Sequence, residues 1–129
     1  MKFIATKEAP QAIGPYSQAV VVNGFIYTSG QIALSPAGVM STGNVEEQTH
    51  QVMKNLLEVL AAAGATFNDV IKTTIFLADM NDFEKVNHIY AYYFGEHKPV
   101  RSTVAVKTLP KNALVEIDCI AVAGADYNY

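Results

Sequence analysis

The sequence predicts an α+β fold in which one mixed β-sheet carries two helices on one of its faces. Three observations support this fold class. Runs of β-branched and aromatic residues, which favour strands, occur near both ends and in the middle of the 129-residue chain. Two intervening segments carry apolar residues at helical spacing. The resulting order of elements is β-β-α-β-α-β-β, and the length fits one domain over residues 1–129.

The first half of the chain predicts a hairpin followed by a helix. Strands at residues 18–22 and 25–28 flank Asn23-Gly24, which suits a two-residue turn because both positions tolerate positive φ. The helix begins after Asn44, which resembles the first residue of a capping box with Glu47, and it ends at Gly64. Its apolar stripe recurs at steps of four and three: Val45, Thr49, Val52, Leu56, Val59 and Ala63.

The second half predicts a buried strand, a helix and two closing strands. The strand covers residues 70–77, and the helix covers about 82–94 with Gly95 as its stop. The closing strands span residues 102–107 and 114–122 and are joined through residues 109–112. The expected buried face of the second helix consists of Phe83, Val86, Tyr90 and Tyr93.

The composition indicates an oligomer. Half of the residues are hydrophobic and 16% are charged, against a usual charged fraction of about 25%. No segment is left to cover the second face of the sheet, so packing against other subunits is the natural cover for it.

Several classes of function are disfavoured by the same numbers. The net charge is −3 and the lysines are scattered, so the basic patch of a nucleic-acid binder is missing. The sequence shows neither a cationic and apolar leader nor an apolar stretch of about 20 residues, so a membrane protein is not expected. The single cysteine, Cys119, fits a reducing cytoplasmic compartment, and three scattered histidines offer no zinc spacing.

Arg101 is the only arginine in the chain, beside eight lysines. A guanidinium is a planar fork that binds a carboxylate or phosphate through two parallel hydrogen bonds, which lysine cannot do. Position alone leaves two interpretations open. One is an anion-binding residue, and the other is a salt bridge at the rim worth about 0–1 kcal/mol.

Glu116 is the second unusual residue. Alternation along the last strand places Glu116 and Asp118 on one face, opposite Cys119, which is expected to be a packed thiol. Carboxylates are disfavoured in strands. They are either solvated at an edge, or at least one has a partner or a raised pKa. Glu116 is the better candidate for a site because it lies nearer the preceding turn.

Four further positions are candidates for contacts with a ligand. Gly30 directly follows a strand, beside Ser29, and permits close approach of a ligand to the backbone, or simply a bulge. Tyr16 follows a proline and offers a phenol, although a lone aromatic is more often core. Asn87 borders the apolar face of the second helix, where a buried amide needs a partner.

Four segments together resemble the signature segments of the RidA family, also called YjgF/YER057c/UK114. They span residues 13–19, 28–32, 99–102 and 115–117, and the resemblance runs from about residue 9 to residue 122. It implies a chorismate-mutase-like α+β fold and a homotrimer whose sheets form a central barrel, with sites in the clefts between subunits. It also implies hydrolysis of 2-aminoacrylate and 2-iminobutanoate to 2-keto acids and ammonia.

The resemblance further implies a role for each candidate residue. Arg101 would hold the substrate carboxylate, and Glu116 would activate the attacking water. Backbone groups of Gly30 and Thr103 would bind substrate or water. Tyr16 and Ser29 would shape the entrance, and Asn87 would support the pocket. No metal or organic cofactor is implied. Many members have cysteine where this chain has Thr103, which argues against a thiol-based function here.

Three other functions compete with the deaminase. A non-catalytic regulatory trimer that binds small acids would use the same Arg101. Chorismate mutase has a similar fold, but its dianionic substrate favours several cations, and the chain has one arginine. An endoribonuclease activity, ascribed to some relatives, fits poorly with the negative net charge and the scattered lysines.

Overall fold

Six strands form one mixed sheet in the computed structural model, which describes residues 1–124. The strands are β1 (Lys2–Ile4), β2 (Ala19–Val22), β3 (Phe25–Thr28), β4 (Val70–Leu77), β5 (Val100–Ala105) and β6 (Val115–Val122). The two α-helices are α1 (Val45–Ala62) and α2 (Phe83–Phe94). Three short 3₁₀ turns, Phe67–Asp69, Met80–Asp82 and Pro110–Asn112, connect them.

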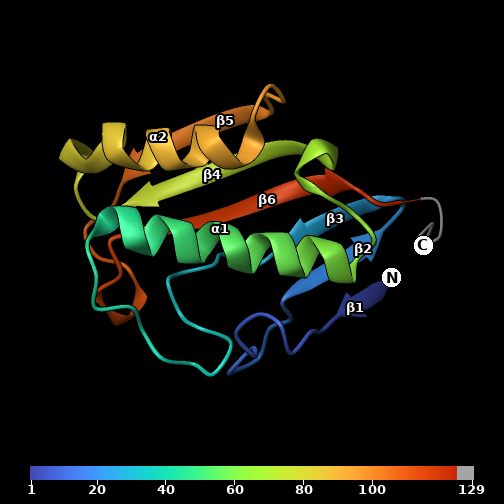
Figure 1. The fold of residues 1–129 in the computed structure, drawn as a ribbon. Helices are drawn as coiled ribbons and strands as arrows, with labels where there is room; N and C mark the ends of the chain where they lie inside the picture. The colour runs from blue at the N-terminus through green and yellow to red at the C-terminus, as the bar shows by residue number, and fades with distance from the viewer. Residues whose placement is uncertain (125–129) are drawn as a thin grey trace.

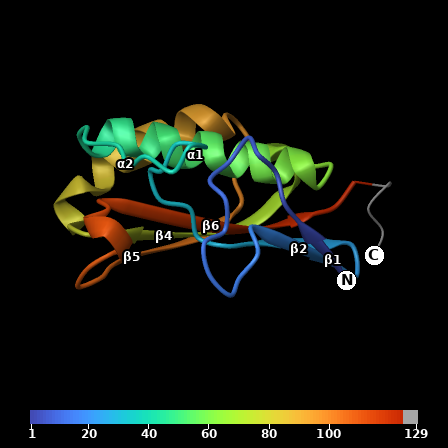
Figure 2. The ribbon, with the colours of Figure 1, turned by 90° about the horizontal axis from the view of Figure 1, so that it is seen from below.

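The strand order in the sheet is β1-β2-β3-β6-β4-β5. Only β4 and β5 are parallel, because α2 carries the chain back between them, and the other neighbours are antiparallel (Figure 1). Both helices lie on the same side of the sheet (Figure 2). The predicted α+β class and the placement of the helices are therefore confirmed.

The hairpin and the first helix form as predicted. Asn23 and Gly24 have φ values of 50° and 79°, as the two-residue turn requires. The Asn44 side chain accepts a hydrogen bond from the backbone N–H of Glu47 at 2.9 Å and so caps α1. All six residues of the predicted apolar stripe are buried: Val45, Thr49, Val52, Leu56, Val59 and Ala63.

The structure corrects three details of the sequence prediction. Strand β1 was not expected, because three residues are too few to show a periodic pattern. Strand β5 spans Val100–Ala105 rather than residues 102–107, because its pairing with β4 runs from Lys72 opposite Val100 to Leu77 opposite Ala105. On α2, Ile89 and Phe94 are buried with Val86 and Tyr90, whereas the predicted Phe83 and Tyr93 are only partly buried.

The sheet face away from the helices is rich in exposed apolar side chains. Side chains alternate between the two faces of a strand, so every second residue points to this face. The exposed fraction is 67% for Phe3 and 43% for Tyr27, Val104 and Val122. An apolar area of this extent is typical of a surface that another molecule covers. Within residues 1–124, no helix is both long and apolar enough to cross a membrane.

Candidate functional site

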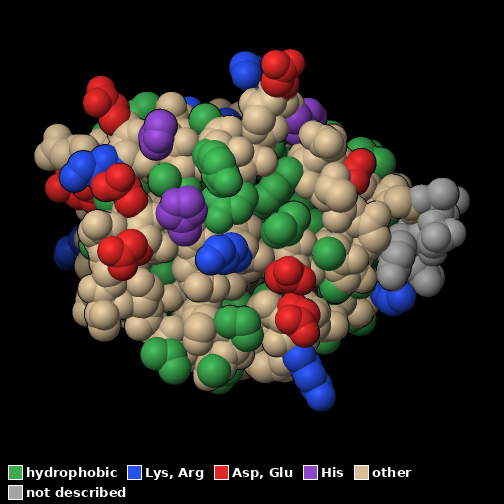
Figure 3. All heavy atoms as spheres, in the orientation of Figure 1, with side chains coloured by type: hydrophobic (Ala, Val, Ile, Leu, Met, Phe, Trp, Pro, Cys, Tyr) green, Lys and Arg blue, Asp and Glu red, His purple; other side chains and the backbone are tan. Residues whose placement is uncertain are grey.

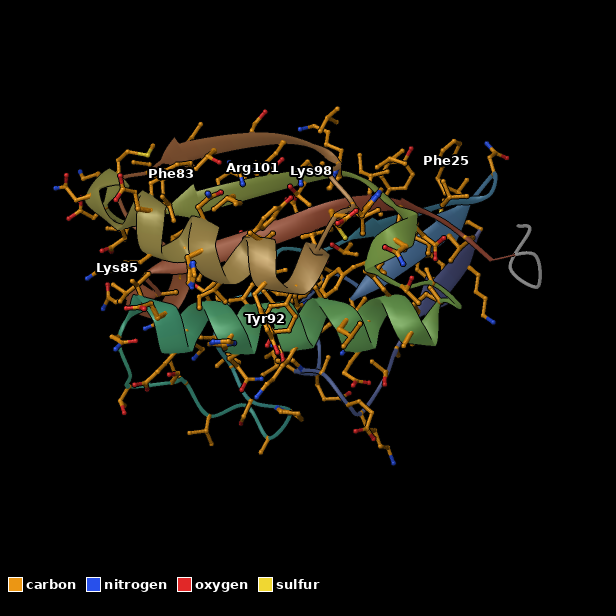
Figure 4. The ribbon with its side chains drawn as sticks, turned by 45° about the horizontal axis from the view of Figure 1, so that its top comes forward. Phe25, Phe83, Lys85, Tyr92, Lys98 and Arg101 are labelled. Atoms are coloured by element: carbon orange, nitrogen blue, oxygen red, sulfur yellow. The ribbon has the colours of Figure 1, made fainter. Side chains whose placement is uncertain are left out.

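Arg101 lies inside strand β5 and its side chain reaches toward α2. Its Nη1 donates a hydrogen bond to Oδ1 of Asn87 at 2.7 Å. Its Cζ lies 5.0 Å from the ring centroid of Tyr90 and 5.5 Å from that of Phe83. Figure 4 shows Arg101 where β5 runs beside α2. The structure thus brings together Arg101 and Asn87, two of the predicted site residues.

No carboxylate pairs with Arg101 within residues 1–124, where its contacts are one amide oxygen and two aromatic rings. The rim salt bridge is therefore not formed inside this part of the chain. A guanidinium has five N–H donors, and Asn87 takes one of them. The remaining donors are available to an incoming anion.

Glu116 is partly buried on β6, and burial is the main reason that its pKa is raised above the ordinary value of 4.5. The neighbouring carboxylate of Asp118 raises the pKa further. The pKa of Asp118 is also raised by burial, although Lys72 partly opposes this effect. Of the two interpretations of this pair, the partly desolvated one is therefore correct.

Gly30 lies against the carboxylate of Glu116. Backbone hydrogen bonds in both directions between Gln31 and Ile117, at 2.9 and 3.1 Å, dock the segment after β3 onto β6. A Cβ atom on residue 30 would lie 2.4 Å from Oε2 of Glu116 and 2.8 Å from its Cδ. A glycine is therefore required at this position for the Glu116 side chain to keep its place.

Gly30→Ala is expected to lower any activity that depends on the position of Glu116 by about 10²-fold with little loss of stability, because the new methyl group displaces only the flexible end of Glu116. Gly43→Ala is a matched control, since its Cβ would meet the exposed Glu47 carboxylate at 1.9 Å in the same way. Activity assays and thermal unfolding of both variants check this. Equal activity of the two variants would contradict the prediction.

A cavity of about 530 Å³ surrounds Glu116. The predicted residues Tyr16, Ser29 and Gly30 line it together with Glu116. Tyr16 is 55% exposed, and its hydroxyl accepts a hydrogen bond from the backbone N–H of Ile13 at 3.4 Å. The Ser29 hydroxyl donates to the backbone carbonyl of Ser17. Tyr16 is thus a surface residue and not part of the core.

Gln18 holds one wall of this cavity, and the sequence analysis did not identify it. Its side chain is buried among the apolar residues at the start of the hairpin. The amide nitrogen donates to the carbonyls of Thr6, Ala9 and Pro10, and the amide oxygen accepts from the N–H of Thr6 at 2.6 Å. In the sequence, a glutamine directly before a run of apolar strand residues could have indicated a buried polar side chain here.

Thr103 lies two residues after Arg101 on β5, on the same face of the sheet. Its Oγ1 is buried, and among the described residues it has no hydrogen-bond partner. A buried hydroxyl without a partner is rare in native proteins. The Thr103 side chain, and not only its backbone, is therefore a candidate for contact with a ligand or a partner.

Arg101 and Glu116 lie on opposite faces of the sheet. Arg101 pairs with Thr73 on β4, and Thr73 faces α2, because its hydroxyl bonds to that of Tyr90 at 2.8 Å. Glu116 alternates with the helix-facing Ile117 on β6 and pairs with Phe76, whose neighbours on β4 are buried beneath the helices. The two predicted catalytic residues therefore do not meet within one chain.

The remaining titratable groups among residues 1–124 form no second centre. Burial raises the pKa of the Cys119 thiol to about 12, and its Sγ accepts a hydrogen bond from Thr28 Oγ1. The expected packed thiol is confirmed. In the described part of the chain, no group of three or more His, Cys, Asp or Glu residues could hold a metal ion.

Comparisons with known proteins assign the family. The family described as Endoribonuclease L-PSP matches residues 6–123. The chain belongs to this family. A RutC family protein of Synechocystis is 55% identical over 95% of this chain and 96% of the relative. The 2-iminobutanoate/2-iminopropanoate deaminase of Mus musculus is 53% identical over 95% of this chain and 92% of the relative.

The solved structures agree with these relatives. Escherichia coli TdcF with bound serine matches with a TM-score of 0.91 and 41% identity over 96% of this chain and all of the other. The resemblance to the RidA family is thus confirmed along nearly the whole chain.

Proposed function

We propose that this protein hydrolyses 2-aminoacrylate and 2-iminobutanoate to 2-keto acids and ammonia. The observation that carries the proposal is the guanidinium of Arg101, which is held in place by Asn87 and has no carboxylate partner among residues 1–124. Such a group is ready for one carboxylate of a small substrate. The 53% identical mouse relative bears the name of this deaminase.

The chemistry requires one water and one base. Arg101 holds the substrate carboxylate, which fixes the position of the adjacent imine carbon. Glu116, as a carboxylate, takes a proton from water while the water oxygen bonds to that carbon. The proton then passes to the imine nitrogen, which gives a carbinolamine. The carbinolamine hydroxyl gives its proton to Glu116, which passes it to the nitrogen, and the C–N bond breaks so that ammonia leaves as the C=O bond forms. 2-Aminoacrylate enters this scheme as its imine tautomer, after a proton has moved from its nitrogen to its β-carbon. The imine carbon is already electrophilic, so the scheme needs no cofactor.

Five residues complete the proposed site. Backbone groups of Gly30 and Thr103 bind the substrate or the water, and the unpartnered Thr103 hydroxyl offers a further donor. Tyr16 and Ser29 shape the entrance of the cavity around Glu116. Asn87 orients Arg101 through the 2.7 Å hydrogen bond.

The site requires at least two subunits. Because Arg101 and Glu116 lie on opposite faces of one sheet, both reach one substrate only if they come from different chains. The exposed apolar face of the sheet is available for this assembly. We therefore propose a homotrimer in which the sheets form a central barrel and the three sites lie between subunits. A cytoplasmic location fits the single buried cysteine.

The proposed function is tested with threonine dehydratase and threonine, which supply 2-iminobutanoate. The purified protein is expected to accelerate the release of 2-ketobutyrate in proportion to its concentration. A protein that binds 2-ketobutyrate without accelerating its release would instead be the regulatory trimer that senses small acids.

Mixed oligomers test whether the site is shared. Arg101→Ala and Glu116→Gln chains, co-expressed with different tags in equal amounts, are expected to recover about one quarter of the wild-type activity. In a randomly assembled ring, about a quarter of the sites combine an intact Arg101 with an intact Glu116 from the neighbouring chain. Each variant alone is the control. A mixture as inactive as the separate variants would place both residues in one chain's site.

The ribonuclease named in the family description is a poorer fit. Acidic and basic side chains are interspersed over the face seen in Figure 3, and they form no continuous basic surface there. The net charge is −3. A phosphate backbone is bound mainly through clustered lysine and arginine, so this chain lacks the electrostatic basis for tight RNA binding.

A further inference from the structure

The charge of Arg101 is supported by aromatic rings rather than by an acid. The guanidinium carbon lies 5.0 Å from the ring centroid of Tyr90 and 5.5 Å from that of Phe83. A cation over the face of an aromatic ring is attracted to it, most strongly where water is excluded. A ring, unlike a carboxylate, does not neutralise the cation and does not compete with an incoming anion.

The Tyr90 side chain is held by β4, the strand that pairs with β5. Tyr90 is 6% exposed, and its hydroxyl bonds to the Thr73 hydroxyl at 2.8 Å. Thr73 is 1% exposed and is the direct partner of Arg101 in the pairing of β4 with β5. The paired strands β4 and β5 therefore position both groups. Strand β5 carries Arg101, and Thr73 on β4 holds the Tyr90 ring that lies next to the guanidinium.

Tyr90 stays neutral in this arrangement. Burial is the largest influence on its pKa and raises it above 10.0, while the hydrogen bond with Thr73 and the charge and hydrogen bonding of Arg101 act in the opposite direction. The ring thus presents an uncharged face to the guanidinium. Packing alone does not require a hydroxyl at this position, because Phe94 fills the neighbouring place on the same helix with its ring 4.5 Å from that of Tyr90.

We propose that Tyr90 is a positioning residue for the deaminase, with Thr73 as its anchor. The ring supports one side of the Arg101 guanidinium and Asn87 fixes its rotation. The free edge then meets the carboxylate of a 2-imino acid in one orientation. This inference rests on the proposed function of Arg101 as the group that binds the substrate carboxylate.

Kinetics of three variants test the proposal. Tyr90→Leu removes the ring, and it is expected to raise KM for 2-iminobutanoate and Kd for 2-ketobutyrate about 10-fold, with kcat changed by less than about 3-fold. Tyr90→Phe keeps the ring but loses the hydrogen bond to Thr73, and its KM is expected to stay within about 3-fold of the wild type. Thr73→Val keeps the packing but removes the anchor, and it is expected to raise KM by about 3-fold.

Val86→Ala is the matched control. Val86 is 1% exposed on the same helix α2, and it is not one of the three residues of that helix that hold the guanidinium, which are Asn87, Tyr90 and Phe83. Its truncation weakens the packing of the helix but leaves the support of Arg101 intact. A purely structural role for Tyr90 would make Tyr90→Leu behave like Val86→Ala, with a lower stability and an unchanged KM.

The single arginine provides a direct readout that does not depend on activity. The chain has one guanidinium, so its Nε–H group gives one NMR signal, which is expected upfield in the wild type because it lies near aromatic ring faces. The signal is expected to move toward the free-arginine position in Tyr90→Leu. Tyr90→Phe and Thr73→Val both lose the hydrogen bond between these two side chains but keep the ring, so each is expected to move the signal only slightly. These two variants still test the anchor if Tyr90→Leu does not fold.

The outcomes separate this inference from the proposed function. A wild-type protein that does not accelerate the release of 2-ketobutyrate would overturn the proposed function itself, and an active Arg101→Ala variant would overturn the role of Arg101 in it. If Arg101→Ala is inactive while folded Tyr90→Leu keeps the wild-type KM and the upfield signal, only the role of Tyr90 is overturned. A Tyr90→Phe variant as impaired as Tyr90→Leu would likewise contradict support by the ring.

Discussion

Replacing Arg101 with alanine is expected to lower kcat/KM for 2-iminobutanoate by about 10³-fold. The guanidinium has no carboxylate partner within residues 1–124, so its removal leaves no internal acid exposed or unpaired. Binding and orientation of the substrate are lost while the fold is kept. Release of 2-ketobutyrate in the threonine dehydratase assay measures this effect.

Two further variants test whether the geometry of the guanidinium matters or only its charge. Arg101→Lys keeps the cation but loses the paired donors, and it is expected to remain about 10²-fold below the wild type. Lys85→Ala removes the same charge from an exposed position on α2, where Figure 4 labels it, and it is expected to retain full activity. A fully active Arg101→Lys variant would show that only the electrostatic field is needed.

The sequence predicted most of the architecture because the fold depends on local patterns. The Asn23-Gly24 turn, the Asn44 cap and the burial of alternate residues from Val115 onward each follow from a few neighbouring residues. Strand β1 could not be predicted in this way. Its three residues are placed by pairing with β2, which is distant in the sequence.

The site was predictable only in part, because its geometry depends on contacts between distant segments. The lone arginine and a carboxylate in a strand were visible as unusual residues. That they lie on opposite faces of the sheet follows from the pairing of β4 with β5 and β6, which no local pattern reports. Tyr90 was predicted only as a core residue, since its contact with Arg101 arises from the packing of α2 on the sheet.

Glu116→Gln is expected to lower kcat by about 10²–10⁴-fold, because glutamine occupies the same space but cannot accept a proton from water. Loss of stability does not explain such a result. Burial raises the pKa of Glu116 in the folded chain, so the ionised carboxylate costs stability as the pH rises through that value. Glutamine removes this cost, and the variant is expected to unfold at a higher temperature than the wild type at neutral pH.

The pH dependence of the wild type follows from the same shift. As the base, Glu116 must be ionised, so kcat/KM is expected to fall as the pH decreases through its raised pKa, which lies above 4.5. In Glu116→Gln this acidic limb should disappear from the residual activity.

Asp118→Asn is the matched control, two residues along the same strand and on the same face. Its activity at neutral pH should stay within about 3-fold of the wild type. Because the Asp118 carboxylate contributes to the raised pKa of Glu116, the acidic limb should move to lower pH in this variant. An acidic limb that persists in Glu116→Gln would assign the role of the base to another group. A limb that moves in Asp118→Asn and vanishes in Glu116→Gln identifies Glu116 as the group that takes the proton from water.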